Sequence, residues 1–140
     1  MVDEEFILSD TTIRFIRETI RPNTGILKEL EIYARENQVP IVQAEPAALL
    51  LVLGRALKPS DILEIGTAIG YSAILMSQFL EPGGRIETIE RDEKMIRLAR
   101  QNISSAGLDS AINVIAGDAA DVLECLEKEY DMIFLDAAKG

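Results

Sequence analysis

The chain has 140 residues, 48% of them hydrophobic and 27% charged, which suits a single folded domain and excludes a disordered polypeptide. Its formal net charge of −10 argues against non-specific nucleic-acid binding over the whole surface. The absence of histidine excludes Ser-His-Asp and Cys-His catalysis, histidine-ligated zinc and a histidine general base. A single cysteine, an acidic N-terminus and the lack of a ~20-residue apolar run fit a cytoplasmic protein.

The first 60 residues have the pattern of a helical region. Ser9 or Asp10 can cap a first helix that runs to about residue 21, where a proline interrupts it. Thr24 can cap a second helix, and a third is expected over 46–57, after an extended connector at 39–42. We therefore expect residues 1–60 to form an N-terminal helical region.

After residue 60, short apolar runs alternate with amphipathic stretches. This pattern predicts strands at 61–65, 85–89, 112–115 and 130–135, and helices at 71–80, 92–107 and 118–127. Repeated strand–helix–strand units imply a doubly wound α/β fold, with a parallel sheet and helices on both faces. Ligands of such sheets bind beyond the carboxyl ends of the strands, so the residues that follow each strand are the candidates for a site.

Four of these strand ends carry polar or glycine residues. The glycine loop Gly66–Gly70 follows the first strand and has the spacing G-x-x-x-G, whereas dinucleotide folds use G-x-G-x-x-G. Glu90 follows the second strand and can accept both hydroxyls of a ribose. Asp118 follows the third strand and can accept a hydrogen bond from an adenine amino group or cap its own helix. Asp136 follows the fourth strand. Each of these residues could instead have a purely structural role. Because all of them fall at successive strand ends and converge on one crevice, together they predict a nucleoside-containing ligand.

Several of these segments resemble a known family. Asp61–Ser72 (DILEIGTAIGYS), Thr88–Asp92 (TIERD), Ile112–Ala119 and Tyr130–Gly140 (YDMIFLDAAKG) look like the small metal-dependent O-methyltransferases of the catechol and caffeoyl-CoA type. The resemblance covers roughly residues 38–140. Within that group the chain is most similar to bacterial enzymes that methylate 5-hydroxyuridine in transfer RNA. The resemblance implies S-adenosylmethionine as methyl donor, Mg²⁺ or Mn²⁺ as cofactor, and a homodimer.

The resemblance also implies roles for single positions. Glu90 would hold the donor's ribose. Asp136 would bind the divalent cation, contact the methyl donor and take part in catalysis, and Lys139 matches the lysine proposed as general base. The positions that would border the adenine are Gly117, Asp118 and Ala119. Those that would lie along the methionine part of the donor, or close over it from the N-terminal side, are Val42, Gln43, Glu64, Gly66, Thr67, Ala68, Gly70, Tyr71 and Ser72.

The implied chemistry needs no histidine. A cation favours the deprotonated form of the acceptor hydroxyl, and the resulting oxyanion displaces the sulfonium methyl group in line. The favoured acceptor is 5-hydroxyuridine in tRNA. Arg14, Arg17 and Arg21 share one helical face, which contacts RNA phosphates or is merely solvated.

Other interpretations stay open. A small catechol-like phenol is the alternative acceptor, and a donor-binding module without catalysis is the alternative of another class. The glycine spacing disfavours a nicotinamide oxidoreductase. Family members complete the metal site with an Asp-Asn pair after the next strand. We therefore expect residues 61–140 to be the first part of an α/β domain that continues. Residues 1–140 alone should be inactive and should associate through the strand at 130–135.

Overall fold

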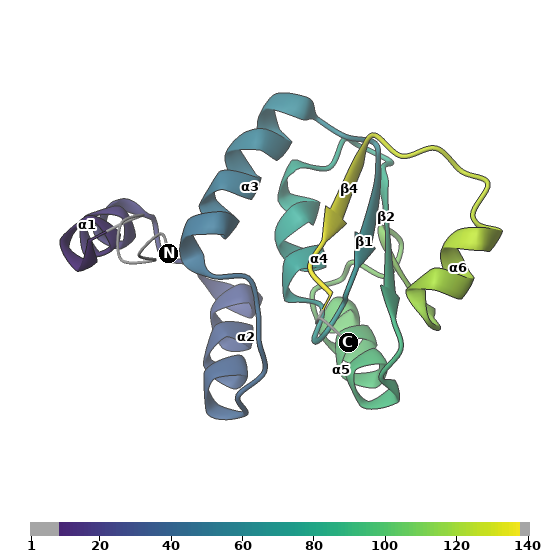
Figure 1. Ribbon diagram of the computed structural model, residues 1–140, viewed down its shortest axis with the longest axis horizontal. Coiled ribbons are helices and arrows are strands. Elements are labelled where there is room, and N and C mark those ends of the chain that lie inside the picture. The colour runs from purple at the N-terminus through teal and green to yellow at the C-terminus, as the bar shows by residue number, and fades with distance from the viewer. Residues whose placement is uncertain (1–8, 138–140) are drawn as a thin grey trace, which may run out of the picture.

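The computed structural model describes residues 9–137. Three helices come first, and four strands then alternate with further helices (Figure 1). The elements are α1 Asp10–Thr19, α2 Gly25–Glu36, α3 Ala44–Leu57, β1 Asp61–Ile65, α4 Tyr71–Met76, the 3₁₀ turn η2 Ser77–Phe79, β2 Arg85–Glu90, α5 Glu93–Ser105, β3 Ile112–Ala116, α6 Ala119–Cys125 and β4 Met132–Leu135.

The four strands form one parallel sheet in the order β3-β2-β1-β4. Residues alternate between its two faces, as the strand period requires. Ile62 and Ile86 pack on the face covered by α3, α4 and α5, whereas Leu63 and Ile89 pack under α6. Figure 1 shows α6 on the opposite side of the sheet from α3 and α4. The predicted doubly wound α/β class is therefore confirmed.

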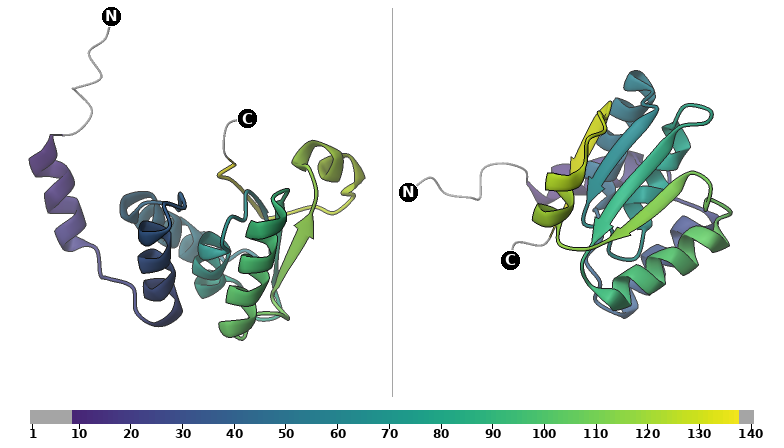
Figure 2. Two further views of the ribbon diagram at one scale, coloured as in Figure 1. Left: turned by 90° about the horizontal axis from the view of Figure 1, so that it is seen from below. Right: turned by 90° about the vertical axis from the view of Figure 1, so that its right-hand side faces the viewer.

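The helices before β1 join the same core. Leu27 and Leu30 of α2 and Leu50 of α3 are buried together with Ile62 of the sheet. Helix α1 buries none of its residues, and its Phe15 is 66% exposed. Figure 2 shows α1 at one end of the molecule, away from the sheet. No helix within residues 9–137 has the length and apolar character needed to cross a membrane.

Two helix boundaries and one predicted cap differ from the sequence prediction. Helix α1 ends at Thr19 and not at residue 21, because the residue before a proline disfavours helical backbone. Helix α3 begins at Ala44, so Pro46 lies in the first turn, where its missing N–H has no helical partner to lose. Thr24 takes the N-cap position of α2 without a side-chain bond, and Gly25 after it has a φ of +58°.

Several further elements are shorter than predicted, among them helix α4 and strand β4. Helix α4 stops at Met76 and continues as the turn η2 to Phe79. Strand β4 begins only at Met132; just before it, the Asp131 side chain accepts the backbone N–H of Asp61 (3.0 Å). Two predicted caps are confirmed: Ser9 accepts the N–H of Thr12, and Asp92 accepts that of Met95.

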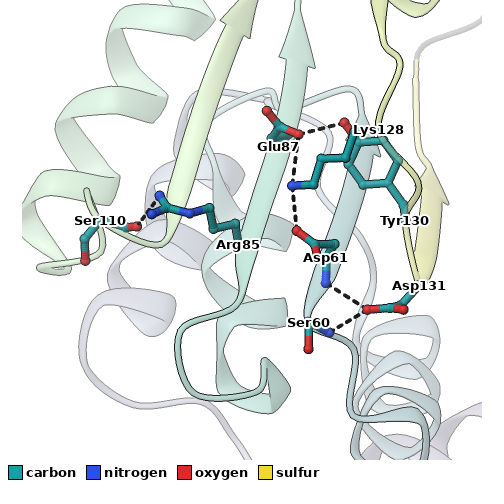
Figure 3. Close-up of polar contacts among 8 residues, drawn as sticks. All are labelled: Ser60, Asp61, Arg85, Glu87, Ser110, Lys128, Tyr130 and Asp131. Atoms are coloured by element: carbon teal, nitrogen blue, oxygen red, sulfur yellow. Dashed lines mark hydrogen bonds and ion pairs between the residues drawn. The ribbon is translucent and has the colours of Figure 1, made fainter.

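A polar cluster ties the segment before β4 to the amino-terminal halves of β1 and β2 (Figure 3). The Tyr130 hydroxyl donates to Glu87 (2.7 Å), and the Lys128 ammonium forms ion pairs with Asp61 and Glu87. The Asp131 carboxyl accepts the backbone N–H groups of Asp61 and Ser60, and these hydrogen bonds lower its pKa. This cluster lies away from the carboxyl ends of the strands, so it stabilises the sheet and does not enter the candidate site.

Candidate functional site

The carboxyl ends of the four strands are joined directly to one another. The backbone N–H of Asp136, after β4, donates to the carbonyl of Ile65 at the end of β1 (3.0 Å). Gly66 donates to the carbonyl of Ile89 (3.0 Å), and Gly117 donates to that of Glu90 (2.9 Å). The glycine loop, Glu90, Asp118 and Asp136 thus meet at one edge of the sheet, and we call this group the strand-end site.

Gly66 brings the glycine loop close to the end of β4. Its φ is +99°, and a Cβ atom there would lie 2.7 Å from the carbonyl oxygen of Asp136. Real side chains do not reach such contacts, so only glycine fits. Ala68 also has a left-handed backbone, with a φ of +46°, although it is not glycine. This conformation directs its N–H to the Glu90 carboxylate (2.9 Å).

The Glu90 carboxylate is held by three backbone donors. Its Oε2 atom accepts from Ala68, and its Oε1 atom accepts from Arg91 (2.9 Å) and Asp92 (3.0 Å). A carboxylate that accepts several backbone N–H bonds is fixed in place. Glu90 is half-buried, so a rigid anion is presented where a ligand beyond the strands would lie.

A buried hydroxyl network lies beneath the loop. Glu64 is fully buried on β1 and accepts hydrogen bonds from Ser72, at the start of α4, and from Thr88 of β2 (2.6 Å). The Thr67 hydroxyl lies 2.6 Å from that of Thr88, which already donates to Glu64, so Thr67 donates to Thr88. The network connects the glycine loop to both central strands.

Burial raises the pKa of Glu64 to about 7. The hydroxyl bonds from Ser72 and Thr88 act in the opposite direction, and the negative charges of Asp136 and Glu90 raise the pKa further. Removal of a carboxylate from water disfavours its charged form most strongly when no cation is near. Glu64 therefore changes its charge near neutral pH.

Asp118 performs the structural role that the sequence allowed. Its carboxylate accepts the N–H of Ala120 (2.9 Å) and so caps α6, and it forms an ion pair with Arg91 (3.7 Å). Ala119 is half-buried and packs against the cluster that contains Ile89. Both residues remain at the strand edge, beside Glu90.

The other predicted donor residues lie beside a second feature, which we call the N-terminal groove. This open groove of about 1400 Å³ lies among α1, α2, α3 and the start of α4, and Val42, Gln43 and Tyr71 line it. Arg17, Arg21, Arg35 and Arg55 line it too, whereas Arg14 does not. The phenol of Tyr71 donates to Glu31 of α2 and makes no bond to the glycine loop.

Sequence reasoning missed side chains that hold the loop in place. The Asn102 amide of α5 donates to the carbonyl of Ile69 (2.8 Å), and Thr88 completes the buried network. A signal for Thr88 exists, because it precedes Glu90 by two positions and therefore shares its face of the strand. Nothing local marks Asn102, which lies 33 residues from its partner.

The described residues do not form a complete cation site. Asp136 is exposed at the end of β4, and residues 9–137 contain no group of three His, Cys, Asp or Glu side chains able to hold a metal ion. One carboxylate is too few to hold a hard divalent cation against water. Lys139, the predicted general base, lies outside the described residues.

The chain resembles proteins of known family in both sequence and structure. A catechol O-methyltransferase of Niastella koreensis is 38% identical over 110 residues, which cover 74% of this chain and 50% of that protein. An O-methyltransferase from Bacillus cereus in complex with SAH superposes with a TM-score of 0.78 at 33% identity, over 89% of this chain and 59% of that chain. The SAH-bound methyltransferase PaMTH1 from Podospora anserina gives 0.82 at 28% identity, over 91% and 56%.

The curated relatives are longer than this chain. The chain spans about half the length of the first relatives that it matches. The sequence profile of a family described as "O-methyltransferase" matches residues 18–140, which is most of the chain and includes the whole strand-end site. The chain therefore belongs to the O-methyltransferase family.

Proposed function

We propose that the protein is an S-adenosylmethionine-dependent O-methyltransferase that binds its methyl donor at the strand-end site. The observation that supports this most is the fixed Glu90 carboxylate, which faces a glycine loop too close to β4 to carry a side chain at Gly66. The family membership and the SAH complexes of two structural relatives support the same donor.

Each part of the proposed site has a physical task. Glu90 accepts the ribose hydroxyls, Asp118 and Ala119 border the adenine, and the loop from Gly66 to Ser72 carries the methionine part. The bound donor supplies a sulfonium methyl group for in-line transfer to an oxygen. The protein's share is to orient that group, since positioning supplies much of the rate of such a transfer.

Glu90→Ala should weaken donor binding by roughly 1–3 kcal/mol, the range for hydrogen bonds to a charged group. Calorimetry with S-adenosylhomocysteine (SAH) measures this directly. Glu93→Ala is the matched control, because it removes the same charge from the exposed start of α5. Equal affinities for both variants would remove Glu90 from the donor site.

A divalent cation stays part of the proposal. Asp136 would supply one ligand and Lys139 would act as general base, on the strength of the sequence motif. The other ligands are not among residues 9–137, so no step above depends on the cation. A homodimer and a cytoplasmic location likewise remain predictions.

The favoured acceptor is 5-hydroxyuridine in tRNA. Four arginines and a single carboxylate, Glu31, line the N-terminal groove, although the whole chain has a net charge of −10. A basic groove beside Val42 and Gln43 suits a phosphate backbone that delivers a base to the donor. A catechol-like phenol is the second candidate, favoured by the catechol O-methyltransferase of Niastella koreensis.

A transfer assay separates the two acceptors. The full-length protein is incubated with Mg²⁺ and labelled donor, in parallel with undermethylated tRNA and with catechol. We expect label in tRNA, with Arg21→Ala/Arg55→Ala raising the KM for tRNA and reducing its salt dependence. Arg97→Ala, on α5 and outside the groove, is the control. Label in catechol alone would contradict an RNA acceptor. Unchanged tRNA kinetics in Arg21→Ala/Arg55→Ala would contradict RNA binding in the N-terminal groove.

A further inference from the structure

Tyr71 takes part in a closed cluster of three side chains. Its hydroxyl donates to the Glu31 carboxylate (2.9 Å). The Asn23 amide donates to the same carboxylate oxygen (2.8 Å) and to the Tyr71 hydroxyl (3.0 Å). Tyr71 is only 3% exposed, whereas Asn23 and Glu31 are half-buried, and all three residues line the N-terminal groove. A hydroxyl on so deeply buried a side chain is costly to leave unpaired.

The three residues come from separate parts of the chain. Asn23 lies between α1 and α2, Glu31 lies on α2, and Tyr71 is the first residue of α4, directly after Gly70 of the glycine loop. The cluster is therefore a direct polar link between the N-terminal helices and the loop assigned to the donor. The two segments are 40 residues apart in sequence where Tyr71 meets Glu31.

Helix α2 leads directly into the segment 39–43. The N–H of Val39 donates to the carbonyl of Ala34 in the last turn of α2 (2.9 Å), so the start of this segment follows the helix. Val42 and Gln43 then line the N-terminal groove together with Tyr71. A shift of α2 relative to Tyr71 would move this segment relative to the glycine loop.

The phenol is suited to a permanent link. Burial, together with its bond to Glu31, raises the pKa of Tyr71, so the hydroxyl keeps its proton at all physiological pH values. Lys28 lies 3.7 Å from the second oxygen of Glu31 and forms an ion pair with it. The hydrogen bond from a hydroxyl donor to a carboxylate acceptor is strong and has a fixed direction.

We propose that Tyr71 is a positioning residue, whose hydroxyl holds α2, and through α2 the Val42–Gln43 segment, in register with the glycine loop before the donor binds. The inference rests on the proposed donor site. Because the Val42–Gln43 segment is already aligned, donor binding does not pay the entropy of ordering it. Loss of the hydroxyl should therefore weaken donor binding without removing any contact to the donor.

The test compares variants that keep the ring or the acceptor. Tyr71→Phe should weaken SAH binding by roughly three- to thirtyfold, and Glu31→Ala by a similar factor. Glu31→Gln retains an acceptor oxygen for the phenol and should restore most of the affinity. Tyr33→Phe is the control, because the Tyr33 hydroxyl on α2 makes no hydrogen bond to the residues that the structure describes. The double variant Tyr71→Phe/Glu31→Ala should lose little more SAH affinity than either single variant, because both substitutions remove the same interaction.

Hydrogen exchange without donor supplies an independent measurement. The amides of Val39 and of residues 41–43 should exchange faster in Tyr71→Phe than in Tyr33→Phe, whereas those of β1 should not change. If Tyr71→Phe lost stability but bound SAH like Tyr33→Phe, with unchanged exchange over 39–43, the phenol would be a packing residue and the inference would be wrong. If the parent protein failed to bind SAH, the proposed donor site would be wrong. The exchange rates over 39–43 would then be the only test of whether Tyr71 holds this segment in place.

Discussion

Gly66→Ala is expected to lose donor binding and to unfold at a much lower denaturant concentration than the parent protein. The added Cβ would lie 2.7 Å from the Asp136 carbonyl oxygen and 3.0 Å from the Ala137 Cα, both backbone atoms that cannot rotate away. Left-handed backbone strain and overpacking together cost roughly 2–5 kcal/mol. The loop must then move away from β4, which displaces the site beside Glu90.

Gly83→Ala is the matched control for this variant. Gly83 has a φ of +82°, close to the +99° of Gly66, but an added Cβ there would meet no atom within 4 Å. It should therefore show only the backbone strain, about 1–2 kcal/mol, and keep full SAH affinity. Urea unfolding and calorimetry compare the two. Equal losses in both variants would contradict a close approach between the loop and β4.

Glu64→Gln is expected to change the pH dependence of stability more than any other single substitution in the network. Burial raises the folded-state pKa of Glu64 from 4.5 to about 7. The protonated carboxyl is thus favoured in the folded state. Its stabilising contribution is complete below the unfolded pKa of 4.5 and is lost as the pH rises through about 7. Glutamine stays neutral and keeps polar atoms for Ser72 and Thr88.

Relative to the parent, the variant should therefore gain stability as the pH rises. Between about pH 5 and pH 8.5 the difference in unfolding free energy should shift by roughly 2–3 kcal/mol in favour of Glu64→Gln. Urea unfolding at both pH values measures it. Glu36→Gln, an exposed carboxyl at the end of α2, should show no such shift. Parallel behaviour of the two variants would show that Glu64 is ionised throughout.

The strand-end arrangement could be predicted because its signals are local. Each strand is a short apolar run, and the residue that ends it is polar or glycine, so parallel pairing alone brings Glu90, Asp118 and Asp136 to one edge. Capping residues such as Asp92 are equally visible, because a cap bonds to an N–H only three positions away.

The supporting contacts could not be predicted, because they depend on tertiary packing. The bond between Thr88 and Glu64 exists only once β1 and β2 pair in the observed register. Tyr71 follows the glycine loop in sequence, which suggested a place along the donor, yet its phenol is bound by Glu31 from another helix. Partners far apart in sequence leave no periodic or spacing signal.

We propose that the strand-end site binds a methyl donor and not a dinucleotide. The most direct test is calorimetry of the protein with SAH and, separately, with NAD. We expect saturable SAH binding that Glu90→Ala weakens, and no NAD binding, because the G-x-x-x-G loop lacks the glycine spacing that fits a pyrophosphate. Binding of NAD with no binding of SAH would contradict the assignment of the site.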